Sequence, residues 1–213
     1  MIDGTVLITG GDQPLGAAIA ERMSEASDDI VLGGADGEQL EEAVAQTNEG
    51  SVHSMRTDPR DEYDLERLAE TAAKTGDGGI GLVIPAARIS HNEPAEPLTD
   101  IAYASLDDEL RTNLRGVFAT IKEVAPHATE STKFLVPVTD TTEISETYAI
   151  GESAIKRLVE GVEITTGLSI AAVDVGDSVS NGELDVDRAA GSVVAAATKD
   201  TEEYDGRVFQ NAD

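Results

Sequence analysis

The regular alternation of short apolar runs with amphipathic stretches constrains the fold of this chain more than any other feature. Apolar runs such as GTVLIT (4–9), DIVLGG (29–34) and IGLVIPAA (80–87) are each followed by a segment with helical spacing of apolar side chains. The alternation repeats about seven times with short connections. Nearly continuous apolar strands joined through helices indicate a parallel sheet buried on both faces. We therefore expect an α/β fold: a doubly wound parallel sheet of about seven strands with helices on both faces.

The remaining elements follow from the same periodicities. Further strands are expected at 51–57, 133–139, 168–175 and 206–211, and helices at 15–26, 37–47, 62–74, 103–128, 147–164 and 187–199. In the long helix 103–128 the residues expected to face inward are Leu106, Leu110, Leu114, Val117, Phe118 and Ile121. In 147–164 the apolar side consists of Ile150, Ala154, Ile155, Leu158 and Val162. No linker, repeat or low-complexity segment divides the chain, which predicts one domain spanning residues 1–213.

The charge balance is strongly acidic and limits the partners of the protein. The chain has 42 acidic and 15 basic residues, for a net charge of −27, and only five of the basic residues are lysine. At molar salt the Debye length falls to about 3 Å, so that the self-repulsion is screened. An acid-rich, lysine-poor chain therefore suggests a salt-accumulating cytoplasm, although an ordinary acidic protein remains an alternative. Nucleic acid is not an expected partner, because phosphate binding needs a positive surface.

Other classes of function are excluded by what the sequence lacks. Cysteine is absent, so disulfides and thiolate metal sites are excluded, and no run of 18 or more apolar residues occurs. The beginning, MIDGTVLITGG, has no basic segment and reads directly as a strand, which indicates a cytoplasmic protein without a membrane partner. His53, His91 and His127 are scattered and predict no metal site. The carboxylate clusters at 41–42, 107–109 and 202–203 are interpreted as solvated faces.

A glycine-rich turn, TGGDQPLG (9–16), follows the first strand and opens the first helix. Glycines permit a tight turn, and the N–H groups at a helix N-terminus can hold a pyrophosphate. Pro14 suits a first helical turn but has no N–H to donate, and Asp12 adds a carboxylate to the same loop. The turn is therefore either a weakened dinucleotide site or a turn whose glycines serve packing only.

With these residues the chain resembles the short-chain dehydrogenase/reductase family along essentially its whole length, which implies a Rossmann-type fold. The family turn reads T-G-x-x-x-G-x-G; Thr9, Gly10 and Gly16 match it, and Pro14 replaces the middle glycine. The resemblance implies further cofactor positions. Asp58 matches an aspartate near the adenine, and Asp36 could accept from a ribose hydroxyl.

Two further motifs of the family depart from its pattern. Ala35 stands where NADP-preferring members tend to carry arginine, which favours NAD if a dinucleotide binds at all. The family motif N-N-A-G is replaced by IPAA (84–87), and Arg88 follows it. The candidate cofactor-binding residues are thus Gly10, Gly16, Asp36 and Asp58, and the expected cofactor is NAD or none.

The catalytic set of the family is asparagine, serine, tyrosine and lysine. Asn113 in TNLRGVF matches the asparagine, and Tyr148 matches the tyrosine. Thr139 could supply the hydroxyl in place of serine, with Asp140 and Thr141 as equally plausible positions. The segment between Thr139 and Tyr148 is shorter than in the family, so the hydroxyl and the phenol need not converge.

The lysine of the family motif Y-x-x-x-K is replaced by Glu152 in YAIGESAIK (148–156). Residues four apart on a helix are neighbours, and a lysine there lowers the phenol pKa from about 10. A carboxylate would raise it instead. Lys156 lies two turns from Tyr148, about 12 Å along the helix axis. Glu152 is interpreted as a surface glutamate, with Tyr148 packed at the start of the helix.

Together these departures predict a family fold with a dismantled active site. The protein would be non-catalytic and would act as a homo-oligomer or as the partner of a related subunit, with or without residual dinucleotide binding. In the family, the helices equivalent to 103–128 and 147–164 often form the dimer contact. The alternative is an NAD(P)-dependent oxidoreductase with an altered proton relay made of Asn113, Thr139, Tyr148 and water.

Overall fold

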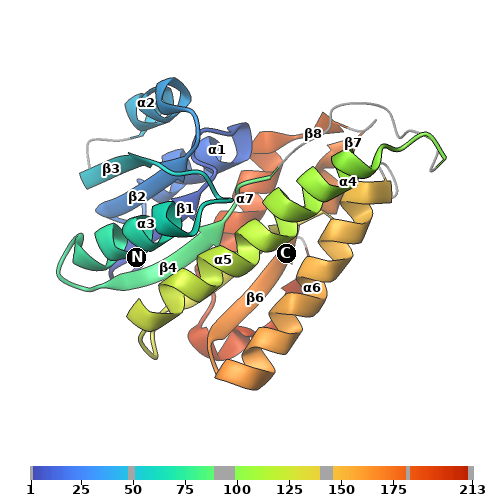
Figure 1. Cartoon of the computed structure of the whole chain (residues 1–213). Helices are drawn as coiled ribbons and strands as arrows, with labels where there is room; N and C mark the ends of the chain where they lie inside the picture. Colours follow the sequence, from blue (N-terminus) through green and yellow to red (C-terminus); the bar gives the residue numbers. More distant parts are fainter. Residues whose placement is uncertain (1, 48–50, 89–98, 140–145, 181–182, 211–213) are drawn as a thin grey trace.

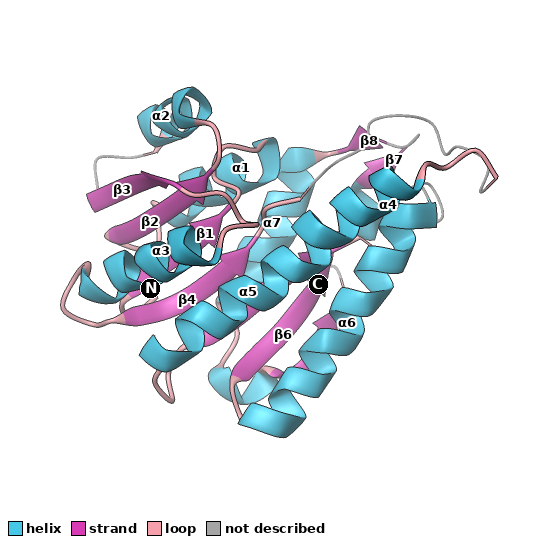
Figure 2. Cartoon of the chain, viewed as in Figure 1, coloured by secondary structure: helices cyan, strands magenta, loops and turns pink. Residues whose placement is uncertain are grey.

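The computed structural model describes residues 2–47, 51–88, 99–139, 146–180 and 183–210. Its centre is a seven-stranded sheet with the strand order β3-β2-β1-β4-β5-β6-β9, in which every neighbouring pair is parallel (Figure 1). Helices cover both faces of this sheet (Figure 2). The Rossmann-like α/β fold expected from the sequence is confirmed.

The strands and helices lie close to the predicted ranges. The strands of the sheet are β1 (Thr5–Thr9), β2 (Asp29–Gly34), β3 (Ser51–Arg56), β4 (Ile80–Pro85), β5 (Lys133–Val138), β6 (Ser169–Asp174) and β9 (Asp205–Phe209). The α-helices are α1 (Pro14–Met23), α2 (Gly37–Gln46), α3 (Glu62–Lys74), α4 (Tyr103–Glu109), α5 (Arg115–Val124), α6 (Glu146–Thr166) and α7 (Val186–Ala197). Short 3₁₀ turns occur at Ala125–His127, Gly176–Ser178 and Thr201–Glu203.

Two apolar cores lie on opposite faces of the sheet because successive strand residues point to opposite sides. In β1, Val6 and Ile8 pack into the core that contains residues of α1, α2 and α7. Leu7, between them, packs into the core formed with α3, α5 and α6. All three side chains are fully buried, so the central strands are covered on both faces as their continuous apolar runs predict.

The strand order reverses direction between β1 and β4. From β1 the chain continues outward to β2 and β3, and from β4 it continues the other way to β5, β6 and β9. In open α/β sheets, ligands bind in the crevice outside the carboxyl ends of the strands at such a switch point. The loops that follow β1 and β4 therefore mark the place to look for a site.

The long helix expected at 103–128 is interrupted. A π-helical turn, Leu110–Leu114, separates α4 from α5 and inserts extra backbone into the helix, which changes the direction of the residues beyond it. Phe118 is consequently 50% exposed, and the expectation that it faces inward is wrong. Glu109, assigned to a solvated cluster, is buried immediately before this turn, so that assignment is also wrong.

The apolar side of α6 is also shifted from the one predicted. Ile155 and Val159 are fully buried, whereas Ile150 is 50% exposed. Ile150 lies five positions before Ile155, and this spacing turns the side chain of Ile150 well away from the buried face. Ile150 therefore does not belong to the inward face expected from the sequence.

One small element was not predicted. Within the segment 178–187, β7 (Val179–Ser180) and β8 (Glu183–Leu184) pair antiparallel. Among the residues that the structure describes, no helix is long and apolar enough to cross a membrane.

Candidate functional site

The glycines of the turn after β1 are required by packing. Gly10 has φ +75°, and a Cβ atom there would lie 2.6 Å from the backbone of Ala87. A Cβ atom on Gly16 would lie 2.0 Å from the carbonyl oxygen of Gly10. These separations exclude any side chain without a shift of the backbone. Both glycines, expected to bind a cofactor, thus have a structural reason to be present whether or not a ligand binds.

The side chain of Asp12 reaches across to the end of β2. Its Oδ2 atom accepts hydrogen bonds from the backbone N–H groups of Ala35 at 2.9 Å and Asp36 at 3.0 Å. The backbone N–H groups that follow β2, which a ligand at the carboxyl end of this strand could use, are therefore already bonded to the Asp12 carboxylate. Asp36, expected to accept from a ribose, uses its Oδ1 atom to cap α2, where it accepts from the N–H groups of Glu38 and Gln39.

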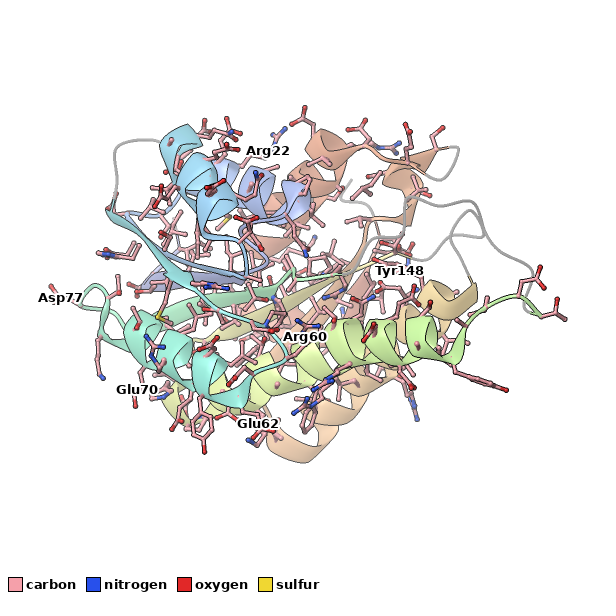
Figure 3. All side chains as sticks on the ribbon, turned by 45° about the horizontal axis from the view of Figure 1, so that its top comes forward. Arg22, Arg60, Glu62, Glu70, Asp77 and Tyr148 are labelled. Carbon is pink, nitrogen blue, oxygen red and sulfur yellow. The ribbon has the colours of Figure 1, made fainter. Side chains whose placement is uncertain are left out.

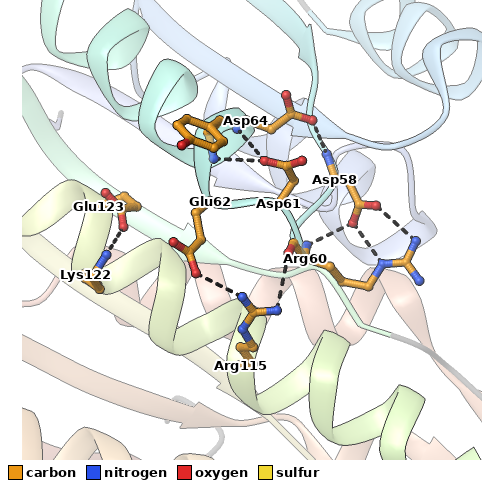
Figure 4. A network of polar contacts seen from close by, with 9 residues as sticks. Asp58, Arg60, Asp61, Glu62, Asp64, Arg115, Lys122 and Glu123 are labelled. Carbon is orange, nitrogen blue, oxygen red and sulfur yellow. Dashed lines mark hydrogen bonds and ion pairs between the residues drawn. The ribbon is translucent and has the colours of Figure 1, made fainter. Parts of the chain in front are cut away.

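Asp58 follows β3, and its carboxylate accepts two hydrogen bonds of 3.0 Å from the Arg60 guanidinium and one of 2.9 Å from the Arg60 backbone N–H (Figure 4). This arginine holds the pKa of the Asp58 carboxyl below its usual range. The pair borders a pocket of about 200 Å³ that is also lined by Gly10, Asp12 and Ala87. The structure thus brings Gly10 and Asp58 to one pocket, as the family resemblance implies.

Arg88 is the residue that the sequence interpretation missed. It follows β4, is only 9% exposed, and spans the ends of two strands. Its Nη2 atom donates to the carbonyl of Pro137 on β5 at 2.8 Å, and its Nη1 atom donates to the carbonyls of Ala87 at 2.9 Å and Pro85 at 3.2 Å. Its Nε atom lies 3.5 Å from the Oε1 atom of Glu152. An arginine directly after a buried strand was the available signal, because a buried guanidinium needs an anionic partner.

Glu152 is 2% exposed, so its interpretation as a surface glutamate is wrong. Its Oε2 atom accepts a hydrogen bond of 2.6 Å from the backbone N–H of Thr139, and Arg88 supplies the opposite charge. Burial raises the pKa of the Glu152 carboxyl; Arg88, the Thr139 N–H group and Lys156 act in the opposite direction. The Glu152 carboxylate thus links α6 to Arg88 after β4 and to Thr139 after β5.

Tyr148 lies at the start of α6 and is labelled in Figure 3. Burial, and secondly the Glu152 carboxylate, raise the pKa of its phenol well above the ordinary value of about 10. Arg88 and a hydrogen bond with the Thr139 side chain lower this pKa, but they do not outweigh the burial. Thr139 and Tyr148 therefore do converge, contrary to the concern raised by the short segment between them. The alternative positions for the family serine, Asp140 and Thr141, lie outside the described residues.

Asn113 and Lys156 belong to two elements that also border this site. Asn113 is 1% exposed and belongs to the π-helical turn that interrupts the long helix. The ammonium group of Lys156 is 3.8 Å from the Oδ2 atom of Asp174 at the end of β6. Lys156, the one lysine in the sequence of α6, is therefore directed to β6. It lies one helical turn beyond position 152, where the family motif has its lysine.

These residues depart from a typical nicotinamide dinucleotide site at three places. The backbone N–H of Arg88 donates to the Oε1 atom of Gln13 at 2.9 Å, which links the loops on the two sides of the switch point. Pro14 has no N–H for a phosphate, and Asp12 places a carboxylate in the same loop. On the far side, Glu152 stands where the family lysine would contact the ribose.

Comparisons with known proteins agree with this architecture. The family described as short chain dehydrogenase matches residues 4–136. An uncharacterised oxidoreductase of Staphylococcus aureus is 24% identical over 185 residues, which cover 83% of this chain and 78% of that protein. A second one, from Staphylococcus saprophyticus, is 22% identical over 196 residues and covers 86% of this chain and 82% of its own.

Solved structures share the fold. A short-chain dehydrogenase/reductase from Serratia marcescens superposes with a TM-score of 0.81 at 18% identity, covering 97% of this chain and 95% of its own. Levodione reductase superposes with a TM-score of 0.82 at 18% identity, and the match covers 99% of this chain and 96% of the reductase chain. Because the matched family region spans more than half of the sequence, the chain belongs to the short-chain dehydrogenase family.

Proposed function

We propose that this chain is a non-catalytic member of its family, which keeps the fold and acts through assembly with a second copy or with a related subunit. The observation that carries the proposal is the buried carboxylate of Glu152 at the position of the family lysine. It is held by Arg88 and by the N–H group of Thr139, so it is an integral part of the structure.

The electrostatics around Tyr148 support the proposal. A phenol that exchanges protons near neutral pH needs a pKa moved toward the working pH, which a nearby cation achieves. Here burial and Glu152 move the pKa of Tyr148 the opposite way, and the neighbouring guanidinium does not reverse the shift. Arg88 is already engaged with three backbone carbonyls and one carboxylate. It therefore stabilises the buried pair rather than a phenolate.

The acidic composition extends the proposal to the setting of the protein. A net charge of −27 favours a cytoplasm rich in salt, where the self-repulsion of the chain is screened. A second copy would meet the exposed apolar side chains of α5 and α6, Phe118 and Ile150, each 50% exposed. Light scattering in molar KCl would show an oligomer on this proposal, and a monomer at all concentrations would argue against self-assembly.

A turnover assay tests the loss of catalysis. The protein is incubated in molar KCl with NADH or NADPH and a panel of aldehydes and ketones, beside a Tyr148→Phe variant. We expect nicotinamide absorbance to fall no faster with the protein than with the variant. Turnover that disappears in Tyr148→Phe would overturn the proposal.

One observation favours a second candidate, an oxidoreductase with an altered proton relay. The Thr139 side chain is hydrogen-bonded to Tyr148, Asn113 is buried nearby in the π-helical turn, and the relatives in Staphylococcus are named oxidoreductases. On this reading the phenol and the threonine hydroxyl would hold a substrate oxygen. Activity that is lost in both Tyr148→Phe and Thr139→Val would support it.

A further inference from the structure

A small cavity lies at the amino ends of the strands, at the opposite edge of the sheet from the switch point. It has a volume of about 200 Å³ and is bordered by Ile2, which precedes β1, and by Lys133, the first residue of β5. Lys199 and Asp200, which follow α7, border it as well. This amino-end cavity is separate from the candidate functional site, which lies at the carboxyl ends of the strands.

Two of the five lysines of the chain, Lys133 and Lys199, border the amino-end cavity. The other three, Lys74, Lys122 and Lys156, each form an ion pair with a carboxylate, whereas these two form none with any residue in the part of the chain that the structure describes. The cavity thus gathers cationic charge in a chain that has 42 acidic residues, and this charge favours an anionic ligand.

The Lys133 ammonium group is held by neutral groups. Its Nζ atom donates to the carbonyl oxygens of Ala197 at 2.7 Å and Lys199 at 2.9 Å, at the end of α7. The same atom lies 5.3 Å from the ring centre of Tyr204, and the Nζ atom of Lys199 lies 5.5 Å from that of Phe209. An ammonium group has three donors, so the two carbonyls leave one N–H of Lys133 for a further acceptor.

The positive charge of Lys133 is only partly compensated in the folded protein. Burial lowers the pKa of its ammonium group, and the Asp200 carboxylate raises it to a smaller extent. Asp200 is exposed, so solvent weakens its attraction for the ammonium group. An anionic group inside the cavity would accept from the third N–H of Lys133 and compensate the charge at short range.

The rest of the cavity wall is largely apolar. It includes Ile2, Met23, Ala26, Val194 and Ala197, of which Met23 and Ala197 are fully buried. An inorganic anion would leave this wall uncovered, whereas a hydrocarbon tail would gain about fourfold in affinity for each carbon that it buries. The volume is below the ~300–1,000 Å³ typical of sites for drug-sized ligands, which limits the tail to a few carbons.

We propose that the amino-end cavity binds a short, branched monocarboxylate of about four to six carbon atoms. The carboxylate would accept from Lys133 near the second cation, Lys199, and the tail would cover the apolar wall between the ends of α1 and α7. This ligand class goes beyond the proposed function, and its binding does not depend on whether catalysis is lost.

Calorimetric titration of the whole chain in molar KCl tests the inference with three probes: isovalerate, acetate and isovaleramide. Isovalerate is expected to bind saturably. Acetate lacks three of its carbons and isovaleramide lacks its charge, so each is expected to bind at least about tenfold more weakly. Absence of saturable isovalerate binding, or a smaller difference for either of the other probes, would overturn the inference.

Four variants locate the binding. Lys133→Met and Lys199→Gln remove the two cations, and Val194→Phe fills the cavity from α7; each is expected to weaken isovalerate binding at least about fivefold. Lys74→Gln is the control, because it makes the same change in net charge on α3 and is expected to leave the affinity unchanged.

Melting temperatures establish that each variant is folded. If Lys133→Met does not fold, because the two carbonyls lose their donor, Lys199→Gln and Val194→Phe decide the question. Unchanged affinity in these two variants would refute the assignment to this cavity. An equal loss in Lys74→Gln would show that net charge alone governs binding and would also refute it. The turnover assay decides the proposed function separately.

Discussion

Removing either partner of the buried Arg88–Glu152 pair should destabilise the protein, but with different dependence on pH. In Glu152→Ala the guanidinium stays charged at every accessible pH, and the buried N–H of Thr139 loses its acceptor. Removal of one member of a buried pair costs about 3–5 kcal/mol. For a protein of this length, about 2–4 °C is lost per kcal/mol, which gives a fall in melting temperature of roughly 6–20 °C. This cost should vary little with pH.

In Arg88→Met the remaining Glu152 can take up a proton. Its pKa in the folded state is already raised by burial, and loss of the guanidinium raises it further. The unfolded chain releases this proton near pH 4.3, so folded Glu152 binds it more tightly and stability falls as the pH rises above that value. The difference in melting temperature between Arg88→Met and the unmodified protein should therefore widen from about pH 5 to about pH 8.

Thermal unfolding followed by circular dichroism in molar KCl, at several pH values, measures both variants. Glu70→Gln is the control, because Glu70 forms an exposed pair with Lys74 on α3 and its loss should leave the melting temperature unchanged. A difference in melting temperature between Arg88→Met and the unmodified protein that stays constant with pH would refute the reasoning. A loss of less than about 1 kcal/mol in the free energy of unfolding of Glu152→Ala would also refute it, because Arg88 and Glu152 would then not form a buried, coupled pair.

Three further outcomes follow from the structure. Gly16→Ala should destabilise the ligand-free protein, because its Cβ atom would meet the carbonyl of Gly10, whereas Gly37→Ala, with open space around it, should be neutral or slightly stabilising in thermal melts. Asp12→Ala should lower the free energy of unfolding in denaturant titrations by about 1.5–3 kcal/mol, because it leaves two backbone N–H groups without their charged acceptor; Asp12→Asn, which retains an acceptor oxygen, should cost less. The melting temperature should rise steadily from low salt to molar KCl, and a flat profile would show that the net charge of −27 does not limit stability.

Much of the fold could be read from the sequence because its signals are local. Apolar runs such as IGLVIPAA identify the buried strands, and the periodicity of 62–74 predicts α3 at its observed bounds. The π-helical turn at Leu110–Leu114 could not be predicted, since one extra residue in a helix leaves no mark in an apolar pattern that is continuous on both sides. The exposure of Phe118 follows from the same turn.

The candidate site was only half predictable. The replacement of the family lysine follows from a spacing of four residues on one helix; Glu152 acts on the pKa of Tyr148 in the expected direction, but burial, which the spacing does not report, raises this pKa more. The burial of Glu152 depends on Arg88, which lies 64 positions earlier in the chain and meets it only because β4 and β5 are neighbours. A pairing of this kind comes from the topology of the sheet, so no local pattern reports it.

The coupling between Arg88 and Glu152 also limits which substitutions these two positions can accept. A single substitution of Glu152 by lysine would set two cations against each other in a buried place, where neither can shed its charge without cost. Loss of Arg88 alone would leave the buried Glu152 carboxyl group without its cationic partner. Placing the lysine of the family motif at position 152 therefore requires two changes, of which the first is harmful whichever comes first. Positions 88 and 152 can therefore change without a loss of stability only if they change together.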